Sequence, residues 1–297
     1  MELRVLHYFL AVAREQSISA AAQSLHLTQP TLSTQLKALE EELGKQLLVR
    51  GTKGSRKVIL TEEGMILRKR AEEILTLVNK AEEEIAHSDD TVVGTVSIGA
   101  GETDIVRYFA KAARTLQKRY PDIRYQISSG NAEYVLEYLD KGLIDFGLVF
   151  GEVDQRKYQS LPLPAKDTWG VLMRRDSPLA EKEAITPQDL WDKPLLLSHQ
   201  RGGSGALFRW LKRDASQLNL VATYNLVYNA SLLVDEGLGY ALTLDKLIHT
   251  EGTDMCFRPL SPGMEATAAI VWKKYQVFTK AADTFLRCLK EQLPQES

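Results

Sequence analysis

The segment from residue 17 to residue 44, SISAAAQSLHLTQPTLSTQLKALEEELG, constrains this chain more than any other. It is typical of two short helices joined by a tight turn. Small alanines in the first helix let a second helix cross closely. Thr28 suits the N-cap of the second helix, and Pro30 is tolerated in a first turn, where its missing N–H costs nothing. Leucines then recur at helical spacing and predict one buried stripe, made of Leu32, Leu36, Leu39 and Leu43.

The side chains on the face opposite this stripe are short, polar or basic, as a helix that lies close to base edges requires. We therefore expect the helix over 28–43 to enter the major groove of DNA. The residues expected at or near the bases are Gln29, Pro30, Thr31, Ser33, Thr34 and Lys37. Phosphate would repel the carboxylates at 40–42, so the N-terminal half of the helix should face DNA. The alternative is an ordinary helical hairpin with a solvated polar face.

Basic residues gather in the first part of the chain. Residues 1–60 hold eight Lys or Arg against five Asp or Glu, although the whole chain has a net charge of −2. The stretch 45–57 has five basic residues and no acid, which predicts a phosphate-binding surface. Strands at 47–49 and 58–60 around a glycine-containing turn predict a β-hairpin wing. We expect phosphate contacts from Arg50, Lys53 and Arg56; the alternative is a solvated charged hairpin.

Two further helices are expected around this motif. One covers residues 2–15 and should pack on the helical pair through one face, made of Leu3, Leu6, Leu10 and Ala13. The other is long, runs from Thr61 to about Ser88, and carries apolar residues at alternating spacings of four and three: Leu67, Ala71, Ile74, Val78, Ala81 and Ile85. Such a seam favours dimerisation, since a two-fold reader of DNA needs it. The alternative is a single helix lying on its own domain.

Residues 1–90 resemble the LysR-type transcriptional regulators. The stretches that carry the resemblance are FLAVAREQSISAAAQSLHLTQPTLSTQLKALEEELGKQLLVR and VILTEEG. The resemblance implies a winged helix-turn-helix DNA-binding domain over 1–60 and a linker and dimerisation helix over 61–90. The sequence departs from the family pattern in two places. Thr34 stands where the family often has arginine, and the wing GTKGSRK is longer than the shortest family version.

From residue 91 strands and helices alternate, which predicts parallel strands with right-handed crossovers. We expect two α/β lobes, one from 91–161 plus 267–297 and one from 162–266, with crossovers near 160 and 266. This arrangement resembles the effector-binding domain of the LysR family, which has the periplasmic-binding-protein fold. The fold class expected for the chain is α + α/β: a winged helix-turn-helix, a long linker helix and a two-lobe α/β effector-binding domain.

Ligands of open α/β sheets bind beyond the carboxyl ends of the strands, where helix N-termini offer free N–H groups. The resemblance to the LysR family implies that contacts of a small-molecule effector cluster at the loops that follow these strand ends. The residues expected there are Gly101, Glu102, Thr103, Ser129, Gly130, Asn131, Ser198, Gln200, Gly203, Ser204, Asn225 and Tyr228. Thr103, Ser129 and Ser204 are the first candidates. Glu102 leaves two alternatives open. It is either a crevice charge that repels an anion or favours a cation, or a structural charge at a helix N-terminus.

The sequence does not indicate an enzyme. The stretch GAGETD has an aspartate where a dinucleotide motif needs its third glycine, and RGGSG lacks the lysine of a phosphate-binding loop. The five histidines and two cysteines show no metal-ligand spacing. We find no signal peptide and no apolar run of membrane-spanning length. We therefore expect a cytoplasmic protein with no catalytic residues, no metal and no cofactor apart from the effector.

Together these features predict a sequence-specific transcription regulator that forms a homodimer or homotetramer and binds an interrupted inverted repeat in double-stranded DNA. The resemblance also implies contact with RNA polymerase. Two alternatives remain open. One is an effector-independent architectural DNA-binding protein, and the other is a pure solute-binding protein, which the additional ninety N-terminal residues disfavour.

Replacement of Lys53 by alanine tests the wing. If Lys53 contacts a phosphate, Lys53→Ala weakens binding to all DNA sequences about equally. The slope of log K against log salt then becomes shallower by about one. Titrations of labelled duplexes at several salt concentrations measure both effects. Equal slopes for the variant and the parent protein would contradict the assignment.

Overall fold

The computed structural model describes residues 1–50, 57–86, 92–198 and 201–293, and the chain divides into two compact units, Met1–Ala86 and His87–Ser297. The wing tip with Lys53 and Arg56, and the residue Gln200, lie outside the described residues. The side chains of Arg50 and of residues 201–204 also lie outside them. Within the described ranges no helix is both long and apolar enough to cross a membrane.

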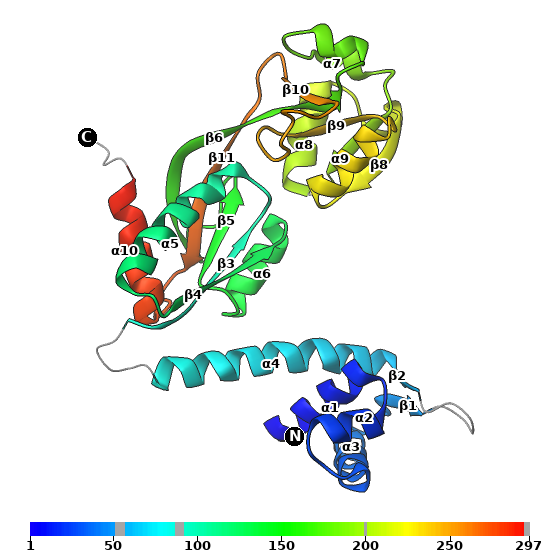
Figure 1. The fold of residues 1–297 in the computed structure, drawn as a ribbon, viewed down its shortest axis with the longest axis vertical. Helices are drawn as coiled ribbons and strands as arrows, with labels where there is room; N and C mark the ends of the chain where they lie inside the picture. Colours follow the sequence, from blue (N-terminus) through cyan, green and yellow to red (C-terminus); the bar gives the residue numbers. More distant parts are fainter. Residues whose placement is uncertain (51–56, 87–91, 199–200, 294–297) are drawn as a thin grey trace. The chain divides into compact units, whose positions relative to one another are not determined.

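The described residues of the N-terminal unit form four helices and a short hairpin (Figure 1). Its elements are α1 (Leu3–Glu15), α2 (Ile18–Ser24), α3 (Gln29–Leu43), β1 (Leu48–Arg50), β2 (Val58–Leu60) and α4 (Glu62–Ala86). The Thr28 hydroxyl accepts a hydrogen bond from the Thr31 N–H at 3.3 Å and caps α3. Gly44 ends that helix at a φ of 64°, a left-handed conformation that glycine adopts without strain. Strands β1 and β2 pair antiparallel, so the predicted hairpin is present.

Helix α1 is buried on two faces rather than one. Val5, Phe9 and Val12 pack with the leucines of α3, whereas Leu6 packs with Ala71 and Leu75 of α4. The prediction of a single buried face was therefore wrong in part. Leu3, which we placed on that face, is 46% exposed because it lies in the first turn, beyond both contacts.

The predicted seam of α4 has two different environments. Its first half contacts α1, and Ala71 is fully buried there. Further along, Ala81 is exposed and Ile85 is 75% exposed. The alternative of a helix lying on its own domain thus describes the first half, while the second half keeps apolar side chains uncovered within this unit.

The C-terminal unit is built on one mixed sheet. Its strands are β3 (Gly94–Ala100), β4 (Ile123–Ser129), β5 (Phe146–Phe150), β6 (Tyr158–Arg174), β7 (Leu195–Ser198), β8 (Leu220–Tyr224), β9 (Tyr240–Leu244), β10 (Met255–Pro259) and β11 (Glu265–Lys273). They lie in the order β4-β3-β5-β11-β6-β9-β7-β8, and β10 pairs with β6. The predicted parallel pairing is confirmed for β3 with β4 and β5, and for β7 with β8 and β9.

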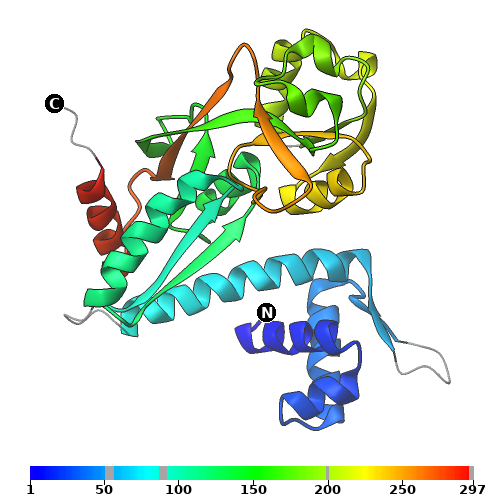
Figure 2. The same cartoon turned by 45° about the horizontal axis from the view of Figure 1, so that its top comes forward.

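Helices cover both faces of the sheet in each lobe. In the first lobe α5 (Arg107–Arg119), which follows η1 (Asp104–Val106), and α10 (Lys280–Gln292) lie side by side on one face, and α6 (Ala132–Asp140) covers the other (Figures 1 and 2). In the second lobe α7 (Pro187–Leu190) and α8 (Arg201–Leu211) pack on one face and α9 (Val227–Asp235) on the other. Short η2 (Pro178–Glu181) and η3 (Ala215–Gln217) complete this lobe.

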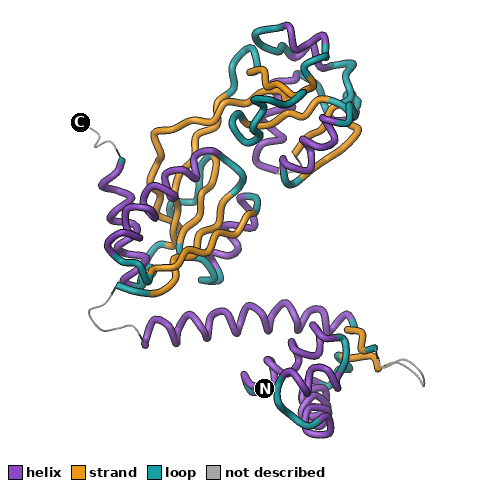
Figure 3. Tube along the Cα trace, viewed as in Figure 1, coloured by secondary structure: helices purple, strands orange, loops and turns teal. Residues whose placement is uncertain are grey.

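The crossovers expected near 160 and 266 are parts of long strands. β6 has 17 residues and β11 has 9, and the two pair antiparallel as they run between the lobes (Figure 3). We predicted a strand only over 170–173; Pro162 and Pro164 lie in the part of β6 that was not predicted. The ladder accommodates Pro162 opposite Ala269, next to a shift in register. Strand β10 was also missed.

Asp167 lies on the crossing part of β6 and is almost fully buried. Its carboxylate accepts a hydrogen bond from the Thr103 hydroxyl, which also caps η1 through the Ile105 N–H at 3.0 Å. Burial raises the pKa of the Asp167 carboxyl above its usual value of 3.8. The Thr103 hydrogen bond acts in the opposite direction, but it is the smaller of the two effects. The crossing strand is thereby joined to the loop that follows β3.

Glu40 joins α3 to the hairpin. Its Oε1 accepts hydrogen bonds from the Leu47 N–H at 2.7 Å and the Leu48 N–H at 3.0 Å. We expect Glu40→Ala to destabilise the N-terminal unit by about 2 kcal/mol, because two partly buried donors lose their acceptor. Urea unfolding measures this loss, with the exposed Glu41→Ala as control. Equal stabilities of the two variants would contradict the role given to Glu40.

Asp167→Asn should change how stability depends on pH. The pKa of this carboxyl is raised in the folded state. Between pH 3.8 and the raised pKa, the folded state therefore holds a proton that the unfolded state has lost. The wild type therefore loses stability relative to Asp167→Asn as pH rises from 3.8 through the raised pKa, by about 1.4 kcal/mol per pKa unit. Urea midpoints across this range, with the exposed Asp122→Asn as control, measure the effect. A difference that does not vary with pH would contradict it.

Candidate functional site

The exposed face of α3 carries the side chains that we expect near the bases. Gln29, Pro30, Thr31, Thr34 and Lys37 are exposed, and Ser33 is half-buried, while the leucines at 32, 36 and 39 are buried on the opposite side. Helix packing in this unit therefore leaves the polar face of α3 uncovered.

Several hydroxyl and amide groups on this face already have partners inside the unit. Gln29 Oε1 accepts from the Ser19 hydroxyl at 2.8 Å, which links α3 to α2. The Thr34 hydroxyl donates to the Pro30 carbonyl at 2.9 Å, and so it keeps acceptor capacity only. These bonds hold the polar side chains in fixed directions. Of the three phosphate contacts expected on the hairpin, Arg50 is the last residue of β1, and Lys53 and Arg56 are among the residues not described.

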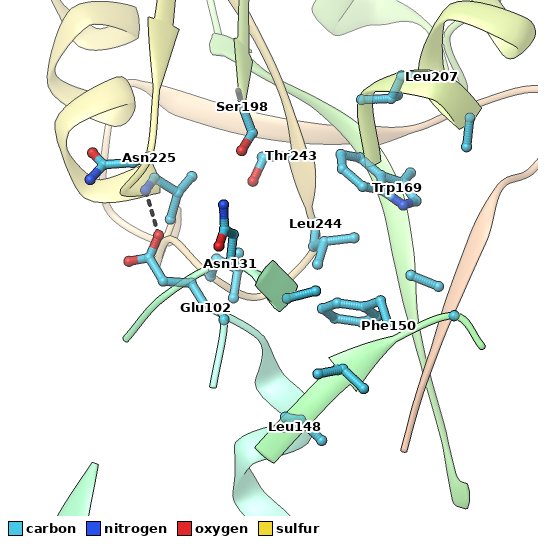
Figure 4. Close-up of a pocket in the computed structure, with 18 of the residues that line it drawn as sticks. Glu102, Asn131, Leu148, Phe150, Trp169, Ser198, Leu207, Asn225, Thr243 and Leu244 are labelled. Carbon is cyan, nitrogen blue, oxygen red and sulfur yellow. Dashed lines mark hydrogen bonds between the residues drawn. The ribbon is translucent and has the colours of Figure 1, made fainter. Parts of the chain in front are cut away.

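The C-terminal unit contains a cavity of about 430 Å³ between its lobes, within the size range of small-molecule sites. Its wall is formed at the carboxyl ends of β3, β5, β7, β8 and β9, and at the places where β6 and β11 cross between the lobes. This is the location that the topology rule for α/β sheets predicts. Figure 4 shows 18 of the residues that line it.

The structure brings together half of the effector contacts that we predicted. The predicted residues that line the cavity are Gly101, Glu102, Gly130, Asn131, Ser198 and Asn225. Asn131 Oδ1 accepts from the Tyr134 N–H at 2.8 Å and so caps α6, which leaves its amide nitrogen on the cavity side (Figure 4). A Cβ atom at Gly130 would lie 2.1 Å from the Tyr134 ring, so this loop requires glycine.

Three of the other predicted contacts lie elsewhere. Thr103 is buried and binds Asp167, Ser129 is exposed at the end of β4, and Tyr228 on α9 is 63% exposed. None of these three is among the described residues that line the cavity. Gly203 and Ser204 belong to α8, but their side chains are not described, and Gln200 is outside the described residues.

Apolar side chains form most of the cavity wall, and sequence reasoning missed them. They include Leu148 and Phe150 of β5, Trp169 of β6, Leu207 of α8, Tyr224 of β8, and Leu244 of β9. Each belongs to an apolar run that also builds the core, so sequence alone does not distinguish the two roles. The Tyr224 hydroxyl donates to the Leu242 carbonyl at 2.7 Å, and burial raises the pKa of Tyr224 to about 12.

Glu102 combines the two alternatives that the sequence left open. It lines the cavity, and its Oε2 accepts a hydrogen bond from the Val227 N–H at 2.6 Å. Val227 is the first residue of α9, so the helix N-terminus that Glu102 contacts belongs to the opposite lobe. The dashed line in Figure 4 marks this bond.

Comparison with known proteins identifies both units. Residues 3–65 match the family described as bacterial regulatory helix-turn-helix protein, lysR family. Residues 89–294 match the family described as LysR substrate binding domain. The chain is 37% identical over 295 residues to the transcriptional regulator BsdA of Bacillus subtilis (strain 168), with 96% of this chain and 99% of that protein covered.

A second relative is the Hca operon transcriptional activator HcaR of Escherichia coli (strain K12), 30% identical over 301 residues, with 99% of this chain and 98% of that protein covered. Among solved structures, full-length CbnR with its target DNA has the same fold, with a TM-score of 0.75 at 20% identity over 98% of this chain and 99% of that chain. These proteins give no support to the architectural alternative. The chain belongs to the LysR family of bacterial transcription regulators.

Proposed function

We propose that α3 enters the major groove of an interrupted inverted repeat. The residues proposed near the bases are Gln29, Pro30, Thr31, Ser33, Thr34 and Lys37, and those proposed at phosphates are Arg50, Lys53 and Arg56. In this proposal a homodimer or homotetramer binds the repeat, and a small molecule in the cavity controls the bound arrangement. We propose these DNA contacts because the polar face of α3 is exposed, whereas its opposite face is buried. Short side chains on this face suit close approach to base edges.

The oligomer is supported by apolar side chains that the N-terminal unit leaves exposed on α4. Met65, Ile66, Leu77 and Ile85 are between 40% and 75% exposed. Exposed apolar residues repeated along one helix favour association with a second helix. A two-fold arrangement would place two copies of α3 on two half-sites.

Control by a small molecule is supported by the position of the cavity. Residues from both lobes line it, so a ligand would contact both at once. A ligand that fits one lobe arrangement better than another shifts the population toward that arrangement. Of the predicted effector contacts we retain those that line the cavity, together with Gln200, Gly203 and Ser204, whose side chains are not described.

The remaining assignments follow from the regulatory role. We also propose a cytoplasmic location, since a protein that binds bacterial operators acts where the chromosome is. Contact with RNA polymerase would turn operator binding into a change in transcription. The proposal assigns no catalytic step to the chain.

Selection of genomic DNA fragments by the purified full-length protein, at two salt concentrations, tests the proposal. We expect an interrupted inverted repeat to be enriched at both. Binding without sequence enrichment would contradict sequence-specific regulation. Failure to bind DNA at the lower salt concentration would contradict the role of α3 itself.

Replacement of Ser33 tests its placement near the bases. We expect Ser33→Ala to change the ranking of operator variants by about 1 kcal/mol or more at one base pair, since base contacts specify sequence. Competition between duplexes that differ at single positions measures the ranking. Ser24→Ala on α2 is the matched control. The same ranking for Ser33→Ala and the parent protein would count against the placement.

A further inference from the structure

Glu102 supplies a cap that α9 lacks in its own sequence. The N-cap residue of α9 is Leu226, which makes no side-chain capping bond. The carboxylate of Glu102 takes this role from the opposite lobe, through the 2.6 Å bond to the Val227 N–H. The N-terminus of this nine-residue helix, which favours negative charge, is therefore occupied by a residue of the chain itself.

This arrangement gives the cavity a fixed negative charge. A ligand carboxylate or phosphate that approached the α9 N-terminus would meet the Glu102 carboxylate and would have to displace it. Glu133 and Glu265 also line the cavity, and Glu265 pairs with Lys166 at 2.6 Å. Among the lining residues that the structure describes, every charged side chain is a carboxylate.

The remaining wall suits the body of an organic cation. The aromatic rings of Phe150, Trp169 and Tyr224 line the same space, and aromatic faces attract ammonium and amidinium groups. Asn131, Ser198 and Thr243 add an amide and two hydroxyls, which project toward the cavity (Figure 4). Hydroxyl groups both donate and accept hydrogen bonds, so they do not select the sign of the ligand charge. The carboxylates therefore determine which sign of ligand charge is favoured.

We propose that the cavity takes an organic cation, an ammonium or amidinium group on an apolar body, and that Glu102 is the residue that sets this preference. The proposal rests on the proposed function in one respect, that the cavity binds the effector. It adds the chemical class of the effector and the residue that distinguishes it from an anion of the same shape.

Three planar probes of nearly equal size test this: benzamidinium, benzamide and benzoate. Isothermal titration calorimetry of the full-length protein at neutral pH, without DNA, measures their affinities. We expect benzamidinium to bind at least about tenfold more tightly than benzamide, and benzoate to bind most weakly. Benzoate affinity equal to or greater than that of benzamidinium would overturn the proposal, as would no binding of any probe.

Glu102→Gln separates charge from shape, because the glutamine oxygen still accepts from the Val227 N–H. We expect this variant to bind benzamidinium no more tightly than benzamide. The control is Glu251→Gln, which removes an exposed carboxylate of the same unit that is not among the described lining residues, and which should keep the wild-type ratio. An unchanged preference in Glu102→Gln would overturn the role of Glu102.

The ranking of probes by the wild type decides the ligand class even if the variant does not fold. The failures of the two proposals are also distinguishable. A protein that enriches an inverted repeat but prefers benzoate retains its regulatory function and loses the cation assignment. A protein that prefers benzamidinium but enriches no DNA sequence gives the opposite result.

Discussion

The pairing of β6 with β11 is the contact on which the effector-binding unit depends. β11 pairs with β5 in the first lobe, β6 pairs with β9 and β10 in the second, and the two long strands pair with each other between them. One ladder of backbone hydrogen bonds therefore passes from lobe to lobe. Trp169 on β6 and residues 265–267 at the start of β11 also line the cavity. A ligand bound there touches the strands that connect the lobes, so occupancy and lobe arrangement are physically linked.

A side-chain carboxylate performs a comparable connecting role in the DNA-binding unit. Glu40 belongs to the acidic run of α3, which the sequence suggested only as a group that phosphate repels. In the structure it accepts the N–H groups of Leu47 and Leu48, and so attaches the start of the hairpin to the recognition helix. The start of the hairpin is thus held against α3 by two hydrogen bonds.

Local signals predicted the elements well where one residue pattern has one structural solution. Thr28 and the leucine stripe identified α3, and continuous apolar runs identified β5 and β7. β6 was predicted only in its apolar last part, because Pro162 cannot donate to a ladder and its tolerance there depends on a partner strand about a hundred residues away.

The residues of the candidate site were also predicted only in part. The rule that ligands meet strand ends identified loops such as those of Glu102 and Asn131, which line the cavity. It did not identify Phe150 or Trp169, since an apolar residue in a strand looks the same whether it faces a core or a ligand. The capping of α9 by Glu102 joins residues 125 positions apart, and no local pattern contains it.

The order of elements along the chain has a consequence for synthesis. The DNA-binding unit is continuous, and so is the stretch from β6 to β10 that builds the second lobe. The first lobe is not, because Phe285 of α10 packs against Phe109 and Phe146 at the centre of its core. Domains fold as they emerge from the ribosome. The whole DNA-binding unit has therefore been synthesised while the first lobe still lacks its last helix. During that interval the nascent chain carries a folded DNA-binding unit, while its effector-binding unit is still incomplete.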